Sequence, residues 1–399
     1  MGMKFIMAIT ILFLIMYFPR VAGWFAWMKP QGLLKADKQH RFALIVPARD
    51  EGRAVLPLFA SIEAQSYKKE LFDTYVIVKN PNDEVIGYAK DINAHVYVDE
   101  KQKSKGDCLD YCIRHILASG RRYDGYIIVD ADCRLDNGFL ENMNDAMKTG
   151  AQVITGRKLV GNYTCGRRGA VNAVTCLNGL IWPIIDELGN RYKSAVGLTT
   201  MPITTGILIC GDLVEEWGGW NYRQTLTEDM ELLRDCACKG IKTFHYSYAR
   251  LYLEEAPSHT DTNRRRTRWM TGMVEADRIY YRELFKRHGL WAFIDNYYIL
   301  SLWIVYIYIG VLSATVFYSL LTLHFLEALV AFLLIYTAFF ALSVMAVLAD
   351  WNNIGLSWVK KLCLMLIHPL FYMEYIFIVG RAVLGIKPES WEKIGRVQY

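Results

Sequence analysis

The chain has 399 residues, 53% of them hydrophobic and 21% charged, with a net charge of +5 and a mean hydropathy of +0.14. Only seven of its 85 charged residues lie between positions 290 and 381, so a membrane-like part and a soluble part are averaged together. A disordered chain, a collagen-like chain and a simple soluble globule are therefore excluded. The mild basic excess fits anionic lipid or an anionic substrate, and it is too weak and too scattered to indicate nucleic acid.

Residues 1–30 predict an N-terminal membrane anchor. Residues 5–18 are apolar apart from one threonine, and residues 21–28 are apolar and aromatic again. A cleaved signal peptide is the alternative, but no clean small-x-small cleavage site follows. Four basic residues come between positions 29 and 41, and only one precedes the apolar run. This asymmetry predicts that the domain after the anchor lies in the cytosol.

Residues 41–255 alternate between strand-like and helix-like segments. Short apolar runs predict strands at residues 42–46, 74–78, 125–129, 153–156, 206–210 and 243–246. Helical patterns predict helices at residues 55–64 and 107–117 and a long helical stretch at 168–186. The alternation implies an α/β fold with a parallel sheet, whose ligand groups gather where the strands end.

Three apolar stretches near the C-terminus, residues 300–321, 326–348 and 362–384, are long enough to span a membrane. The aromatic segment 290–299 is typical of an interfacial helix. The third stretch contains a proline and several ionisable residues. If it crosses, the tail at residues 386–399 lies outside the cell, which its three basic residues disfavour. A re-entrant third stretch is the alternative, and the sequence leaves both open.

Three motifs carry candidate chemistry, and the first is a pair of carboxylates. Asp130 and Asp132 follow the apolar run that ends at Val129. Carboxylate oxygens at a strand end suit Mg²⁺ or Mn²⁺, which would bridge to phosphates. Acidic pairs also cap strands for purely structural reasons, so this motif alone is a weak signal.

The second motif, Thr227-Glu228-Asp229, opens a predicted helix. Thr227 is placed as the N-cap and the acids lie near the positive helix end, which also describes an ordinary well-capped helix. The third motif, Arg264–Trp269, contains four arginines early in an amphipathic stretch that runs to about residue 285. It predicts a guanidinium clamp on a diphosphate with an indole platform for a sugar, or a contact with anionic lipid, and both can hold.

The order of these motifs is more specific than any one of them. A strand-end Asp-x-Asp, a Thr-Glu-Asp about a hundred residues later, an Arg-rich Arg-Trp and then apolar stretches cover nearly the whole chain. This arrangement resembles the processive, membrane-embedded glycosyltransferases of family 2, which include the synthases of hyaluronan, chitin oligomers, cellulose and poly-N-acetylglucosamine. The resemblance implies a cytosolic GT-A (Rossmann-like) glycosyltransferase domain with N-terminal and C-terminal transmembrane helices.

Shorter segments strengthen the resemblance. Val46-Pro-Ala-Arg-Asp-Glu51 looks like the first-strand motif of the family, and Lys105-Gly-Asp-Cys-Leu109 looks like its Lys-Gly-x-Ala-Leu segment. Pro202–Gly206 lies where an acceptor-side loop is expected, and Gly218-Gly-Trp220 precedes the Thr-Glu-Asp. The implied nucleotide-sugar contacts are Ala48, Arg49, Glu51, Asn80, Lys105, Asp130, Arg265 and Arg268. The implied acceptor contacts are Thr205, Gly206, Trp220 and Trp269.

The chemistry of the reaction assigns roles to these residues. Breaking the bond between sugar and diphosphate leaves negative charge, which a cation on Asp132 and Asp130 would neutralise. Arg268, with Arg265 and Lys105, would add charge-assisted hydrogen bonds to the diphosphate. Asp229 is the expected base for the acceptor hydroxyl. Glu228 hydrogen-bonds the acceptor or caps the helix, and Trp269 supports the acceptor ring.

Two positions depart from the family pattern. Arg265 occupies the Gln position of the Gln-x-x-Arg-Trp signature, as in the ceramide glucosyltransferase branch, which adds one sugar to a lipid. The strand ending at Val78 runs into Lys79 and Asn80, where an Asp usually reads the uracil ring. Asn80 has the donor and acceptor needed to replace that Asp, and Lys79 is an alternative phosphate contact.

These observations predict a processive inverting hexosyltransferase that uses UDP-GlcNAc or UDP-glucose to extend a β-linked polysaccharide and helps to translocate it. The alternative is a membrane glycosyltransferase that adds one sugar to a lipid acceptor. A transporter or receptor with a cytosolic ligand-binding domain is a competitor from another class, disfavoured because the spans are few. The predicted organisation is a membrane anchor at 1–30, a cytosolic catalytic domain at 40–285, membrane or interfacial helices at 286–385 and a tail at 386–399. The expected partners are a UDP-sugar, a carbohydrate or lipid-linked acceptor and lipids of the cell membrane, with no nucleic acid.

Overall fold

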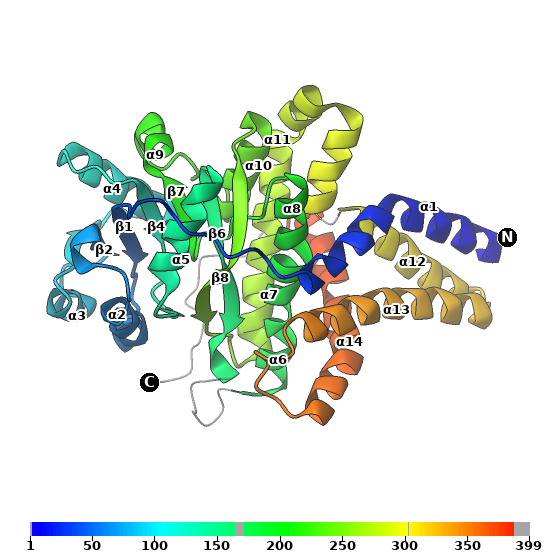
Figure 1. Cartoon of the computed structure of the whole chain (residues 1–399). Coiled ribbons are helices and arrows are strands. Elements are labelled where there is room, and N and C mark those ends of the chain that lie inside the picture. The colour runs from blue at the N-terminus through cyan, green and yellow to red at the C-terminus, as the bar shows by residue number, and fades with distance from the viewer. Residues whose placement is uncertain (1, 164–170, 302, 387–399) are drawn as a thin grey trace.

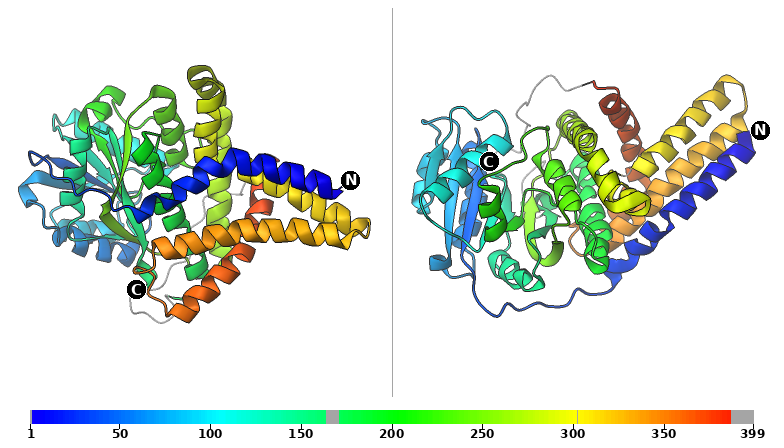
Figure 2. Two further views of the ribbon diagram at one scale, coloured as in Figure 1. Left: turned by 45° about the vertical axis from the view of Figure 1, so that its right-hand side comes forward. Right: turned by 90° about the horizontal axis from the view of Figure 1, so that it is seen from above.

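A computed structural model of the chain describes residues 2–163, 171–301 and 303–386, and it consists of an α/β domain from which a group of long helices extends (Figures 1 and 2). The predicted tail therefore lies almost entirely outside the described residues. The strands are β1 (Phe42–Pro47), β2 (Phe72–Val78), β3 (His95–Val98), β4 (Gly125–Ile128), β5 (Cys133–Leu135), β6 (Val153–Val160), β7 (Ile207–Cys210) and β8 (Thr243–Leu253).

The eight strands form one sheet in the order β3-β2-β1-β4-β7-β6-β8-β5. Strands β3, β2, β1 and β4 are parallel, as the sequence predicted, but β7 pairs antiparallel with both β4 and β6. The expectation of a wholly parallel sheet is therefore wrong. Strand β7 begins at the edge of the sheet where β4 ends, because the helical segment between β6 and β7 returns the chain to that edge. All six predicted strands are present, and β6 and β8 are longer than expected.

The helices of the α/β domain cover both faces of the sheet. They are α2 (Leu56–Glu63), α3 (Val85–Asp91), α4 (Lys105–Ala118), α5 (Phe139–Ala146), α6 (Ala173–Gly179), α7 (Ile181–Pro183), α8 (Arg191–Val196), α9 (Gly211–Trp217) and α10 (Glu228–Lys239). Short 3₁₀ turns lie at Gly52–Val55, Lys69–Leu71, Met147–Thr149 and Gly161–Tyr163.

The long helix predicted at residues 168–186 is broken. Its first three residues lie outside the described part of the chain, and the remainder is divided between α6, α7 and a π-helical segment at Ile184–Asn190. Pro183 lies at the change from α to π geometry and has no backbone N–H to donate, which accounts for the break.

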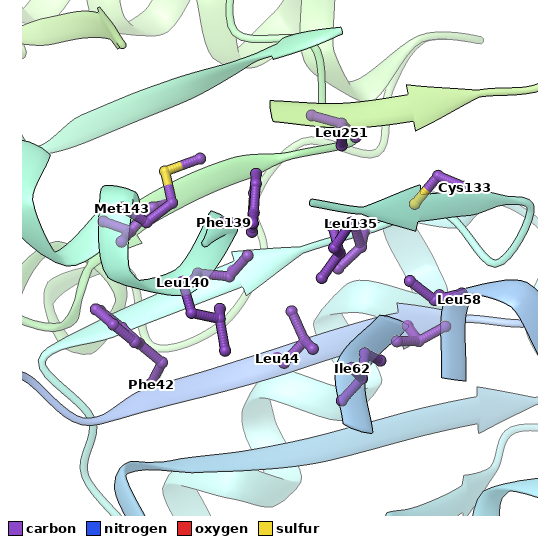
Figure 3. Packing of buried hydrophobic residues seen from close by; sticks show 14 of the residues in the cluster. Phe42, Leu44, Leu58, Ile62, Cys133, Leu135, Phe139, Leu140, Met143 and Leu251 are labelled. Atoms are coloured by element: carbon purple, nitrogen blue, oxygen red, sulfur yellow. The ribbon is translucent and has the colours of Figure 1, made fainter. Parts of the chain in front are cut away.

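The core follows from the period of two along each strand. Phe42 and Leu44 point to one face, where they pack with Leu58 and Ile62 of α2 and with side chains of α5 (Figure 3). Ala43 and its alternate neighbours point to the other face and pack against α4, α9 and α10. Because both faces are covered, the central strands are almost continuously apolar, which is why they were recognisable in the sequence.

Long helices make up the rest of the chain. They are α1 (Gly2–Gly23), which leads into a 3₁₀ segment at Trp24–Met28, α11 (His259–Ser301), α12 (Trp303–Leu321), α13 (Phe325–Ala349) and α14 (Trp358–Val383). Helices α1, α12 and α13 lie side by side and project from the α/β domain, whereas α14 packs against α11 and α13 near its base (Figures 1 and 2).

Among the described residues, α13 and α14 are long and apolar enough to cross a membrane, as predicted. The N-terminal helix passes the same test only when Gly2–Met16 and Val21–Met28 are counted together as one span bent by 50°. The predicted span at residues 300–321 contains a shorter apolar helix, Val305–Leu321. The predicted interfacial segment at 290–299 is the end of α11.

Candidate active site

The reversal of β7 builds the candidate site. Since Ile207 pairs with Ile128, the loop before β7 lies at the edge where β4 ends. Thr205 Oγ1 there accepts a hydrogen bond of 3.0 Å from the backbone N–H of Asp130. Gly206 donates to the Ile128 carbonyl and has a φ of +73°, and an added Cβ would lie 2.5 Å from Leu251. Of the two predicted acceptor contacts, Thr205 therefore positions the Asp130 backbone and Gly206 is bonded to the end of β4.

Lys105 lies at the centre of the charged groups. It begins α4, whose first turn is fixed by a capping box between Ser104 and Asp107. Its Nζ lies 2.5 Å from Asp130 Oδ1 and 3.3 Å from Glu228 Oε1. Burial alone would lower the pKa of Lys105, but these carboxylates raise it above its ordinary value, so the ammonium stays charged.

Thr204 joins two of these groups. Its hydroxyl accepts a hydrogen bond from Lys105 Nζ at 2.8 Å and donates one to Glu228 Oε1, also at 2.8 Å. The side chain is buried. Two hydrogen bonds through Thr204 therefore connect Lys105, at the edge of the sheet, with Glu228 in the first turn of α10.

Asp229 follows Glu228 in that first turn. Burial raises the pKa of Asp229 to about 7, and the neighbouring Glu228 carboxylate adds to the increase. Lys105, the Met230 backbone N–H and Arg268 act in the opposite direction. A carboxyl group that titrates near neutral pH is suited to accept a proton during a reaction.

Helix α10 begins as predicted, but without the predicted cap. Thr227 is the N-cap residue, yet its side chain makes no capping hydrogen bond. Its Oγ1 instead faces Gly272 of α11, where an added Cβ would lie only 2.1 Å away. Glycine at this position lets α11 approach α10 closely, which brings Arg268 and Trp269 toward the acidic turn.

Arg268 and Arg265 have different surroundings. Burial and the nearby charge of Arg265 lower the pKa of Arg268, and Glu228 and Asp229 oppose the decrease. Arg268 Nε is buried and has no hydrogen-bond acceptor among the described residues, so it retains a donor for a ligand. Arg265 Nη1 lies 3.1 Å from Glu255 Oε2, and its guanidinium lies 4.5 Å from the centre of the Trp269 ring.

A hollow of about 230 Å³ lies beyond the ends of β1 and β2. It is lined by Asp50, Glu51, Gly52, Asn80, Asp83 and Glu84, and so unites Glu51 and Asn80, two of the predicted nucleotide contacts. Arg49 lies beside it, with Nε 3.8 Å from Asp50 Oδ2. Ala48 is buried in the core, and its backbone N–H donates to the Ile77 carbonyl, so neither its side chain nor its N–H faces the hollow.

The predicted acceptor contact Trp220 is not available to a ligand at the candidate site. Its side chain is fully buried, its Nε1 donates to the Tyr222 carbonyl, and its ring packs against Trp217 and Tyr222. The indole therefore presents no free face to a sugar. Trp269 is only half-buried and keeps its place beside Arg265.

Sequence reasoning missed Thr204 and Glu255. Thr204 lies in the loop that was singled out, but nothing in a Thr-Thr pair tells which hydroxyl faces the carboxylates. Glu255 is fully buried and accepts hydrogen bonds from Trp182 Nε1 and from Asn178, in addition to its pair with Arg265. Its position just after β8 was the only available signal.

Asp130 and Asp132 at the end of β4 have the donor atoms and the exposure that a divalent cation bound together with a diphosphate needs. No group of three or more His, Cys, Asp or Glu side chains that would enclose a metal exists within residues 2–163, 171–301 and 303–386. Asp130 and Asp132 are each partly exposed, and Mg²⁺ in phosphate-transfer sites commonly binds one or two carboxylates together with water and substrate phosphate. The donor set thus fits an ion that arrives with a diphosphate.

Comparison with known proteins agrees with this geometry. Residues 126–344, more than half of the chain, match the family described as glycosyl transferase family group 2, and the chain belongs to that family. It is therefore a glycosyltransferase. Its α/β domain has the GT-A fold of these enzymes. No curated protein matches the sequence.

Two solved structures illustrate the structural similarity. The mannosyltransferase PcManGT from Pyrobaculum calidifontis, in complex with GDP-Man and Mn²⁺, is 13% identical with a TM-score of 0.54, over 96% of this chain and 97% of that one. Residues 1–349 of TarS from S. aureus, in complex with UDP-GlcNAc, are 12% identical with a TM-score of 0.46, over 84% and 92%. The similarity to the mannosyltransferase supports the fold alone.

We predict that Lys105→Met lowers the stability of the protein by about 2 kcal/mol at neutral pH, because it leaves two partly buried carboxylates without their cation. Thermal unfolding of the purified protein measures the loss, with Lys101→Met on the exposed loop as the control. The difference should shrink at low pH, where the carboxylates are protonated. Equal unfolding temperatures for the two variants at neutral pH would show that Lys105 does not stabilise this group.

Proposed function

We propose that this glycosyltransferase transfers a hexose with inversion from UDP-GlcNAc or UDP-glucose to a growing β-linked polysaccharide. The observation that carries the proposal is the position of the half-buried Asp229 carboxyl in the first turn of α10, next to Glu228 and close to the charges of Lys105 and Arg268, where burial raises its pKa to about 7. A proton acceptor next to cations is what transfer from a sugar diphosphate requires. The order of motifs along the chain supports the choice of donor and polymer.

The donor is held by groups at the carboxyl edge of the sheet. The nucleoside enters the hollow that contains Glu51 and Asn80. The diphosphate receives hydrogen bonds from Arg268 Nε and from the Lys105 ammonium. Asp130 and Asp132 would hold Mg²⁺ or Mn²⁺, which when bound neutralises negative charge on the leaving diphosphate.

The acceptor hydroxyl loses its proton to Asp229. As its oxygen forms a bond to the anomeric carbon, the bond from that carbon to the diphosphate breaks, and the electron pair leaves with the nucleoside diphosphate. Attack from the face opposite the diphosphate inverts the anomeric centre, so that an α-linked donor gives a β-linked product. Glu228 is oriented by Thr204 and Lys105 and hydrogen-bonds the acceptor, while Trp269 supports the acceptor ring.

The proposed organisation places the catalytic domain, residues 40–285, in the cytosol at the cell membrane. The anchor at 1–30 and the apolar helices of 286–385 hold it there. The basic residues that follow the anchor support this orientation.

A single-sugar transfer to a lipid is the second candidate. The observation in its favour is Arg265 in the Gln position of the signature, where the ceramide glucosyltransferase branch has arginine. In the structure Arg265 is engaged by Glu255 and by the faces of Trp182 and Trp269, which orients the indole platform for either acceptor.

Asp229→Asn should abolish transfer and leave nucleotide binding largely unchanged, because the amide accepts no proton yet preserves the shape of the site. The same variant should raise the unfolding temperature at pH 8. A raised folded-state pKa stabilises the protein below the pKa of the unfolded chain, near 4, and this stabilisation is lost as pH rises through 7. Calorimetry and transfer assays measure both effects, and normal transfer by the variant would disprove the base assignment.

The rate of transfer at saturating donor should rise about tenfold per pH unit below pH 7 and level off above it. The reason is that only the ionised form of Asp229 accepts the proton, and its pKa is about 7. A pH series with fixed metal concentration measures this profile. A rate that is flat from pH 5 to pH 8 contradicts the proposal that Asp229 is the base.

The length of the product separates the two candidates. We expect purified protein with UDP-sugar and Mg²⁺ or Mn²⁺ to give a ladder of saccharides on gels or by mass spectrometry. A lipid carrying one sugar, with no longer product at any donor concentration, would replace the polysaccharide proposal by the second candidate.

A further inference from the structure

The two ends of α14 contact the same side of the molecule. Before it begins, Asp350 at the end of α13 pairs with Arg157 of β6 at 2.5 Å. Gly355 packs on Tyr163, where an added Cβ would lie 3.1 Å from the Tyr163 Cβ. Lys361 in the first turn of α14 donates to the carbonyl of Trp351 at 2.5 Å. The start of α14 is therefore held against the GT-A domain.

The second half of α14 is held against α11. Glu374 lies 2.8 Å from His259 Nε2 and 3.5 Å from Arg266 Nη1. The Arg266 guanidinium is buried 3.8 Å from the centre of the Phe371 ring. Near the end of the helix, Arg278 Nη2 donates to the Val383 carbonyl at 2.9 Å.

This part of α11 belongs to the GT-A side. Asp277 pairs with the fully buried Arg234 of α10 at 2.7 Å, and Gly272 contacts Thr227 at the start of α10. Figure 1 and Figure 2 accordingly show α14 beside α11 at the base of the bundle, whereas α1, α12 and α13 extend away from the domain.

The length of α14 makes this arrangement informative. Its 26 residues measure about 39 Å, so a crossing would place its ends on opposite sides of a hydrocarbon layer about 30 Å thick. Both ends instead contact the GT-A domain or a helix packed on it. The composition of α14 permits a crossing, and its contacts oppose one.

The surface of α14 is divided into two faces. The buried face carries His368, Tyr372 and Tyr375 among its residues and packs on α11 and α13. The opposite face is apolar and between 45% and 75% exposed at Leu362, Leu366, Leu370 and Phe377, which are spaced four, four and seven residues apart. Lys360 and Arg381, near its two ends, are also exposed and suit lipid headgroups.

We propose that α14 lies along the membrane surface, with this apolar face in the lipid, and does not cross the bilayer. The occupant of the face is the bilayer that also receives α13. Ile386, which ends the described chain, then lies on the same side as the catalytic domain. Positions 387, 393 and 396 that follow are Lys, Lys and Arg, and so agree with the preference of basic residues for the cytosolic side. The inference rests on membrane attachment and not on the proposed reaction.

Reporter cysteines, added one at a time to the full chain, test the proposal. Ile386→Cys reports the end of α14, Lys101→Cys reports the catalytic domain, and Leu323→Cys reports the turn between α12 and α13; all three positions are exposed. Each is made with Cys363→Ser, because Cys363 is exposed on α14, and labelling of the Cys363→Ser protein alone is subtracted. A membrane-impermeant maleimide is applied to intact and to permeabilised cells.

We expect Ile386→Cys to label from the same side of the membrane as Lys101→Cys. Labelling of Ile386→Cys from the side opposite to Lys101→Cys would overturn the proposal. Leu323→Cys serves as the reference for the far side. Because labelling does not depend on turnover, failure of the proposed glycosyl transfer leaves this result unaffected.

Depth measurements give a second, independent test. Nitroxides at Leu362, Leu370 and Phe377 should report nearly the same depth by their accessibility to oxygen and to a polar nickel complex. A crossing helix would place Leu370 about 12 Å deeper than Leu362, since eight residues rise by that distance. A depth difference of that size would overturn the proposal.

Discussion

The ammonium of Lys105 is the interaction on which the candidate site depends. Three elements far apart in the chain supply its partners: Asp130 after β4, Thr204 before β7 and Glu228 at the start of α10. Partly buried carboxylates that lie close together repel one another, and a cation between them permits their close approach. Lys105 also acts on Asp229, where it opposes the increase in pKa that burial and the neighbouring Glu228 carboxylate cause, and the pKa of Asp229 is about 7. The group of charges at this edge of the sheet therefore joins three segments of the fold and sets the pKa of the residue that we propose as the base.

Much of the fold and part of the site were predictable from the sequence. Strands such as β1 and β4 are buried on both faces, so the sequence shows them as continuous apolar runs. The two acidic motifs contain Asp130 and Asp229, which the structure brings near Lys105. The direction of β7 was not predictable, because four apolar residues do not encode it. Strand β6 continues through Arg157 and Lys158, whose buried pairs with Glu187 and Asp186 cannot be read locally. Trp220 fits a sugar platform by residue type, and only tertiary packing shows its ring enclosed.

The membrane-side helices and the catalytic turn are connected through buried polar groups. Arg266 Nε donates to Asn178 Oδ1, Asn178 donates to Glu255, and Glu255 pairs with Arg265, which lies over the Trp269 ring. Arg266 is also buried among aromatic rings of α14. The position of α14 at the membrane surface thus bears directly on the helix that carries Arg268 and Trp269. Attachment to lipid and alignment of the site share one set of contacts.

The proposed mechanism depends on Asp229 as the base and on attack from the face opposite the diphosphate, which inverts the anomeric centre. The anomeric configuration of the product is therefore the decisive measurement. Purified protein is incubated with Mg²⁺ or Mn²⁺ and a panel of α-linked nucleotide sugars, nucleotide release identifies the donor, and NMR of the new linkage gives its configuration. We expect release of UDP from UDP-GlcNAc or UDP-glucose and a β-linkage in the product. An α-linkage from the same donor would contradict the proposed mechanism.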